Sequence, residues 1–189
     1  MKKWIVILFL SLNAFALPLN EIATTMQTNI DKSLELLKQT KGDKKVAADA
    51  IFKLFDGIFD FKLMAKLSLS KYYDKLSPAQ QAEFNKQFEA SLKKSFSDKL
   101  SLYKDEVLKV KDGEQKNDKR YFLNSSMMID GEEKFVVFKF YNDNGNWLIY
   151  DVDILGISIV QTYRSQFGDI LENADFDTLL KKLEQVSFE

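Results

Sequence analysis

The stretch KFVVFKFYNDNGNWLIYDVDI, residues 134–154, decides the fold of this chain of 189 residues. Two runs of β-branched and aromatic residues flank the turn-forming cluster at 142–146, a pattern that predicts an antiparallel hairpin. The residues before it alternate with the same period and turn at Asp130-Gly131. We therefore expect a four-stranded antiparallel meander with strands near 105–111, 119–129, 134–141 and 147–154.

The regions on both sides of this meander have the apolar spacing of helices. Before the meander, helices are expected over 19–37, ending near Gly42, and over 46–58, with Asp43 as N-cap. A short third helix is expected over 59–67, begun by Asp60, and a long fourth helix from Ser77 through 100, followed by Tyr103. After the meander, Gly156 ends the last strand, and helical stripes follow over 157–167 and 176–183. Ser77-Pro78-Ala79-Gln80 has the form of a capping box. The fold class that follows is α+β, with a helical N-terminal half packed on a four-stranded antiparallel sheet and with C-terminal helices.

The first residues predict export. Lys2 and Lys3 precede an apolar run that reaches Ala14-Phe15-Ala16, which is the form of a secretory signal peptide over residues 1–16. Residues 17–189 then form a single exported domain. The whole chain carries 27 basic and 28 acidic residues, so nucleic acid is not an expected partner.

The composition excludes most catalytic chemistry. The chain has no Cys and no His, which removes disulfides, the usual general base at neutral pH, and most zinc sites. We expect no enzyme, no metal and no cofactor. A carboxylate-dependent enzyme of the cone-shaped α+β type is a minor alternative.

Both faces of the 134–154 hairpin are apolar, although a one-sided antiparallel sheet alternates apolar and polar residues. Val136, Phe138 and Phe140 are expected on one face of the third strand, with Phe135 and Val137 on the other. On the fourth strand Leu148, Tyr150, Val152 and Ile154 are expected to share a face, with Trp147 and Ile149 opposite.

Two explanations fit this pattern. In the first, helices or a dimer interface cover both faces. In the second, which is the fold we expect, the 16 Phe and 7 Tyr line an apolar cavity that the helices and the sheet enclose. The lysine-rich segment 109–120 is interpreted as solvated strand ends.

One string of residues resembles a known family. Trp147-Leu148-Ile149-Tyr150-Asp151-Val152, then Gly156-Ile157-Ser158 and Tyr163-Arg164-Ser165-Gln166-Phe167, are similar to the signature of the MlaC, or toluene-tolerance, family. Leu67-Ser68-Leu69-Ser70-Lys71-Tyr72-Tyr73 and the helix start at Ser77 also match that family's layout. Many members have Gly at the position of Ser70 and Trp at that of Tyr73. Because of these differences, the resemblance does not determine the volume of the pocket.

The resemblance implies a monomeric periplasmic carrier that binds phospholipid and maintains outer-membrane lipid asymmetry. Its implied partners are an outer-membrane lipoprotein complex and the MCE-domain subunit of an inner-membrane ABC transporter. The alternative function is a periplasmic chaperone or binding module for apolar polypeptide segments.

Candidate residues for contact with lipid tails are the apolar and aromatic side chains of the third and fourth helices and the hairpin. They are Phe61, Met64, Leu67, Tyr72, Tyr73, Phe88, Leu92, Phe96, Phe138, Phe140, Leu148, Tyr150 and Val152, each with ordinary core packing as the competing role. Tyr72 and Tyr73 are candidates for a pocket mouth because of their polar tips. Arg164 is expected to pair with Asp151 or Asp153 rather than to bind a phosphate.

Overall fold

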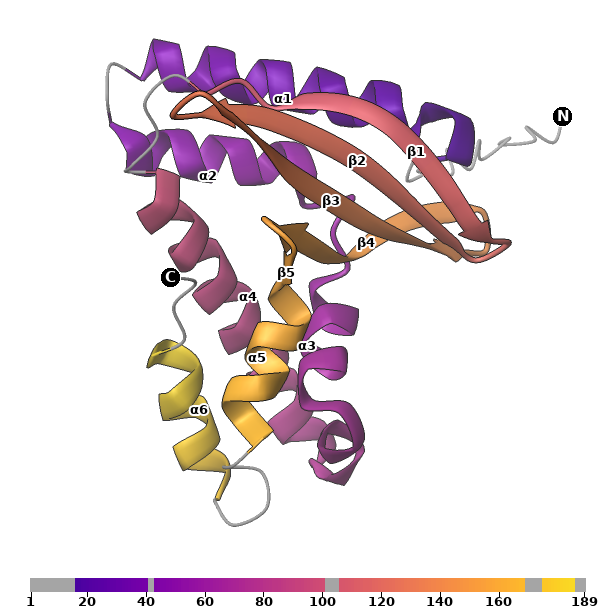
Figure 1. Cartoon of the computed structure of the whole chain (residues 1–189). Coiled ribbons are helices and arrows are strands. Elements are labelled where there is room, and N and C mark those ends of the chain that lie inside the picture. Colours follow the sequence, from indigo (N-terminus) through magenta and orange to yellow (C-terminus); the bar gives the residue numbers. More distant parts are fainter. Residues whose placement is uncertain (1–15, 41–42, 101–105, 169–174, 186–189) are drawn as a thin grey trace, which may run out of the picture.

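The computed structural model describes residues 16–40, 43–100, 106–168 and 175–185, and it confirms the α+β class (Figure 1). The elements in chain order are η1 (Leu19–Glu21), α1 (Ile22–Gln39), α2 (Lys44–Phe55), α3 (Phe61–Leu69), η2 (Ser70–Lys75), α4 (Pro78–Leu100), β1 (Lys109–Asn117), β2 (Arg120–Ile129), β3 (Glu132–Asp143), β4 (Asn146–Ile154), β5 (Ile157–Ser158), α5 (Ile159–Gly168) and α6 (Phe176–Gln185). The expected signal peptide and Tyr103 lie outside the described residues, except for Ala16.

The sheet is an antiparallel meander in the order β1-β2-β3-β4-β5. It has five strands rather than the expected four, because Ile157 and Ser158 pair with Ile154 and Asp153 before α5 begins. The first strand also lies further along the chain than expected. Almost all of its residues are exposed at the edge of the sheet, so it lacks the apolar alternation that marks a half-buried strand.

The helix starts follow the predicted capping chemistry. The Asp60 side chain accepts a hydrogen bond from the Leu63 backbone N–H at 2.8 Å, and Asp43 caps α2 in the same way. At α4 the Gln80 side chain accepts from the Ser77 N–H at 2.9 Å, and the Gln80 N–H donates to the Ser77 hydroxyl at 3.3 Å. The capping box therefore forms as the sequence predicts, because its bonds join residues only three positions apart.

The helices cover the sheet in two groups (Figure 1). Helix α1 runs along the sheet beside β1 with α2 next to it, whereas α3 and α5 pack at the far end of β4 with α4 and α6 around them. Residues 58–60 border β4: the Ile149 N–H donates to the Ile58 carbonyl, and the Asp60 N–H donates to the Ile149 carbonyl. These bonds fix the start of α3 against the sheet.

Candidate functional site

The main core is one continuous apolar cluster between one face of the sheet and the helices. The strands contribute Leu123, Val136, Phe138, Phe140, Trp147, Ile149 and Val152, and the helices contribute Ile22, Met26, Met64, Leu69, Phe84, Phe88, Leu92, Val160, Tyr163, Phe167, Leu179 and Leu183, among others. A smaller second cluster joins α1, α2 and the end of α4. We call the strand surface that contributes to the main cluster the core face of the sheet.

Aromatic rings fill the interface between α4 and α5. The Phe88 ring centroid lies 4.7 Å from that of Tyr163, and the Phe84 centroid lies 6.0 Å from that of Phe167. Burial raises the pKa of the Tyr163 phenol, although hydrogen bonding with Ser91 and Ser95 opposes this effect. Close ring packing makes this part of the core solid.

Nine of the thirteen candidate tail residues belong to the main cluster. Met64, Tyr73, Phe88, Leu92, Phe138, Phe140 and Val152 are buried in it, and Phe61 and Leu67 are partly buried against it. Tyr73 does not lie at a pocket mouth, because it is buried and its hydroxyl bonds to the Asn85 side chain.

Leu148 and Tyr150 lie on the opposite face of the sheet, so the predicted face of β4 is wrong for them. The register between β3 and β4 shifts at this point: Phe140 faces Ile149, whereas Lys139 faces Asp151, which leaves Tyr150 as an extra residue. A bulge of this kind reverses the alternation of side chains along a strand. Trp147 and Ile149 therefore share the core face with Val152.

Tyr150 instead joins a group of aromatic and charged side chains on that opposite face. The Arg120 guanidinium carbon lies 4.3 Å from the centre of the Tyr150 ring, and the Tyr141 and Tyr150 rings meet edge to face. Burial raises the pKa of both phenols, and for Tyr141 the hydrogen bond to Asp60 adds to the effect. Aromatic and charged side chains therefore cover the part of the second face around Tyr150, whereas Phe135 on the same face is 52% exposed.

Phe96 and Tyr72 also fall outside the main cluster. Phe96 is 40% exposed, and its ring centroid lies 5.1 Å from that of Phe52 on α2. Tyr72 is partly buried, and the ammonium groups of Lys71 and Lys75 lie 5.1 and 4.7 Å from its ring centre. Of the two tyrosines proposed for a mouth, Tyr72 is the one near the surface.

Sequence reasoning missed the role of Asp151, which is 5% exposed. One carboxylate oxygen accepts hydrogen bonds from the N–H groups of Val152 and Val160 at 2.9 and 3.1 Å. The other accepts from the Ser158 hydroxyl at 2.7 Å and from the Lys139 ammonium at 3.1 Å. This single carboxylate joins β3, β4, β5 and the start of α5.

Lys139 is bound by two carboxylates. Its ammonium lies 2.6 Å from Asp153 and 3.1 Å from Asp151. Burial lowers the pKa of Lys139, but the hydrogen bonds and negative charges of Asp153 and Asp151 outweigh that effect, so the pKa is raised. The lysine therefore stays charged and holds the bulged part of the hairpin together.

Arg164 does not pair with Asp151 or Asp153, so that prediction is wrong. Its Nε and Nη2 donate to the Leu67 backbone carbonyl at 3.1 and 2.6 Å, near the end of α3. The two aspartates are already occupied by Lys139 and, for Asp151, by backbone and hydroxyl donors. Arg164 therefore joins α5 to α3.

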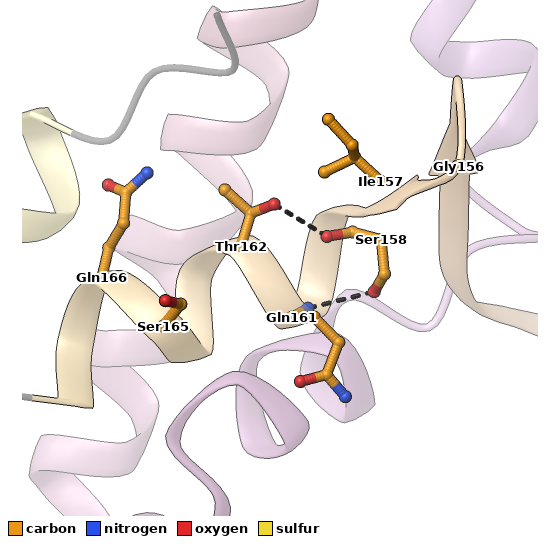
Figure 2. A pocket seen from close by; sticks show the side chains of 7 residues that line it. All are labelled: Gly156, Ile157, Ser158, Gln161, Thr162, Ser165 and Gln166. Atoms are coloured by element: carbon orange, nitrogen blue, oxygen red, sulfur yellow. Dashed lines mark hydrogen bonds between the residues drawn. The ribbon is translucent and has the colours of Figure 1, made fainter.

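The described residues line one open groove beside β5 and α5, with a volume of about 500 Å³ (Figure 2). Its lining residues are Gly156, Ile157, Ser158, Gln161, Thr162, Ser165 and Gln166. Leu155 and Gly156 form the adjoining turn with positive φ angles of 54° and 82°. None of these positions was predicted as a ligand site, although a Gly directly after an apolar strand signals a turn there.

The main feature of the region between the sheet and the helices is its continuous apolar cluster. Within the described ranges no group of three or more acidic, His or Cys residues could hold a metal ion. None of the helices in those ranges is long and apolar enough to cross a membrane. The class that the fold defines is an α+β domain with a continuous apolar interior between its sheet and its helices.

Comparisons with known proteins agree with this class. A family model described as MlaC protein matches residues 27–185. The chain is 22% identical over 199 residues to the intermembrane phospholipid transport system binding protein MlaC of Haemophilus influenzae, covering 98% of this chain and 93% of the relative. It is 24% identical over 139 residues to the toluene tolerance protein ttg2D of Pseudomonas putida, covering 71% of this chain and 64% of the relative.

A solved structure has the same fold. The phospholipid-binding protein from Ralstonia solanacearum, determined in complex with a phospholipid, matches with a TM-score of 0.72 and 21% identity over 86% of this chain and 94% of that chain. This chain belongs to the MlaC protein family. Membership of this family of transport binding proteins confirms the expectations of family and of a non-enzymatic role.

Proposed function

We propose that this protein is a phospholipid carrier that takes acyl chains between the core face of the sheet and helices α3, α4 and α5. The observation that carries the proposal is the continuous apolar cluster, which draws on both halves of a chain that belongs to the MlaC family. A protein of the same fold binds a phospholipid, which supports the assignment. The candidate tail contacts are the nine residues of the main cluster identified above.

The energetics explain why the tails need an enclosed interior. Exposing an acyl chain to water costs about 0.8 kcal/mol per methylene, so two tails of roughly fifteen carbons cost on the order of 20 kcal/mol. A carrier has to replace most of this by burial without binding so tightly that release stops. Because side chains such as Phe88, Phe140 and Ile149 are fully buried, uptake requires the sheet and the helices to move apart.

The working location in this proposal is the periplasm, reached through a signal peptide over residues 1–16. There a monomer exchanges lipid with an outer-membrane lipoprotein complex and with the MCE-domain subunit of an inner-membrane ABC transporter. The intermembrane role in the name of the Haemophilus relative supports this location.

The test is organic extraction of protein purified from cells, followed by mass spectrometry. A carrier brings about one or more phospholipid molecules per chain, whereas a chaperone for apolar polypeptides brings none in fixed proportion. A protein purified in parallel from the same cells serves as the blank. Absence of stoichiometric phospholipid from the wild-type protein would refute the carrier function.

A matched pair of variants on β4 tests the tail site. Val152→Trp adds bulk on the core face, and Leu148→Trp adds the same bulk on the opposite face. We expect Val152→Trp to lower bound lipid severalfold and Leu148→Trp to leave it unchanged, with circular dichroism confirming the fold of both. Equal occupancy in the two variants would show that the tails lie elsewhere.

A further inference from the structure

The core face of the sheet continues past the buried cluster to the surface. Ile154 follows Val152 by two residues and lies opposite buried Val136, so its side chain is on the core face. Ile157 lies opposite Ile154 on β5. These two isoleucines are nevertheless 44% and 58% exposed, so an apolar strip runs from the interior to solvent at this end of the sheet.

The turn between β4 and β5 extends this strip at an energetic cost. Leu155 has a φ of 54° and is 53% exposed. The other non-glycine residues with positive φ in the described ranges are Ser70, Asp130 and Asn144, which are all polar. A branched apolar residue in the left-handed region is disfavoured, and solvent exposure gives it no packing in return. We call residues 154–157 the apolar lip.

The groove in Figure 2 lies directly beside the apolar lip and carries no charged side chain. Ile157, Thr162 and Gln166 point to the same side of α5 in that view. Among the described residues, the Gln161, Ser165 and Gln166 side chains have no hydrogen-bond partner. The groove thus offers free amide and hydroxyl groups in a volume that falls within the ~300–1,000 Å³ typical of small-molecule sites.

The core face, the apolar lip and the uncharged polar groove follow one another along the surface, as the acyl tails and the glycerol-phosphate part follow one another in a phospholipid. We infer that the groove holds the glycerol-ester and phosphate part of the lipid, while the apolar lip guides the tails onto the core face. Uncharged donors can bond ester and phosphate oxygens without selecting for the charge of the rest of the head group. The inference rests on the carrier function and adds to it a site for the polar end of the ligand.

The test adds negative charge to the groove without changing its shape. Gln161→Glu combined with Gln166→Glu places two carboxylates there, and Gln39→Glu combined with Gln115→Glu places two on exposed surface of α1 and β1. Delipidated protein is mixed with phosphatidylcholine vesicles that carry a trace of tail-labelled phosphatidylglycerol or of diacylglycerol with the same tails. The measured quantity is the fraction of each probe that transfers to the protein.

We expect the groove variant to bind phosphatidylglycerol about fivefold more weakly for each added carboxylate at low salt, the effect of two unit charges ~4 Å apart in water. Diacylglycerol lacks the phosphate, so its binding should not change, and the surface variant should match the wild type with both probes. Unchanged phosphatidylglycerol binding, or equal loss of both probes, would overturn the groove assignment. A wild-type protein that takes up neither probe would overturn the carrier function as well.

Leu155→Asn tests the apolar lip separately. Asn tolerates the left-handed region, so the turn is retained while the apolar tip is lost. Uptake of tail-labelled phosphatidylglycerol should become severalfold slower, with thermal stability equal to or above that of the wild type. An unchanged uptake rate would overturn the role of the lip.

Discussion

Replacing Asp151 by Ala should destabilise the protein more than any other single loss of a polar group on the sheet. The substitution removes a buried acceptor from the N–H groups of Val152 and Val160 and from the Ser158 hydroxyl. Hydrogen bonds to a charged group contribute about 1.5 kcal/mol or more each, so the three together contribute about 4.5 kcal/mol or more. Lys139 keeps Asp153 as a partner, so no penalty for an unpaired ammonium is added.

Urea unfolding followed by far-UV circular dichroism measures this loss in delipidated protein. Asp151→Asn keeps a neutral acceptor and should lose about 1–2 kcal/mol. Asp153→Ala is the control: its side chain is 24% exposed and pairs with Lys139, so it should lose about 1 kcal/mol or less. A loss for Asp151→Ala no larger than that of the control would refute the idea that this carboxylate holds β5 and α5 to the sheet.

Three further results are expected from this structure. Ser70→Gly should raise the melting temperature and add about 1 kcal/mol of stability, because φ 52° and ψ −131° suit only glycine; a lower melting temperature would contradict this. Phe88→Ala should lower the free energy of unfolding in urea by about 4 kcal/mol, because the ring is fully buried. Phe96 is 40% exposed, so Phe96→Ala should lower it by less than half as much. Equal losses in the two variants would be evidence against the described core. Burial raises the pKa of the Tyr141 and Tyr163 phenols in the folded state. Their contribution to the free energy of unfolding is therefore complete below the unfolded pKa of ~10 and falls as the pH rises above that value. Unfolding free energies that are equal at pH 8 and pH 11 would be inconsistent with that burial.

Local chemistry made the helical part of the fold predictable. Asp43, Asp60 and Ser77 cap the helices that follow them, because each cap depends on residues within three or four positions. The turn residues Asp130-Gly131 and Asn144-Gly145 likewise adopt the positive φ angles that their residue types favour. The apolar spacing of α4 also placed Phe84, Phe88 and Leu92 in the core.

The candidate site was predictable only in part. Nine of the thirteen proposed residues are in one cluster, since burial of large apolar side chains is the general rule. Leu148 and Tyr150 fell on the wrong face because strict alternation assumes an unbroken register. Edge strand β1 was displaced in the prediction because an exposed strand has no apolar period.

The sequence by itself determined the class of fold, the helix starts, the hairpin turns and the family to which the chain belongs, because these depend on neighbouring residues and on linear motifs. Only the tertiary structure decided that Tyr150 is the extra residue of a bulge, that Asp151 joins three strands to α5, and that Arg164 binds the Leu67 carbonyl. Each of these depends on which groups from distant parts of the chain meet in space. Hydrogen-bonding capacity is fixed by residue type, but the partner is chosen by the packing that surrounds it.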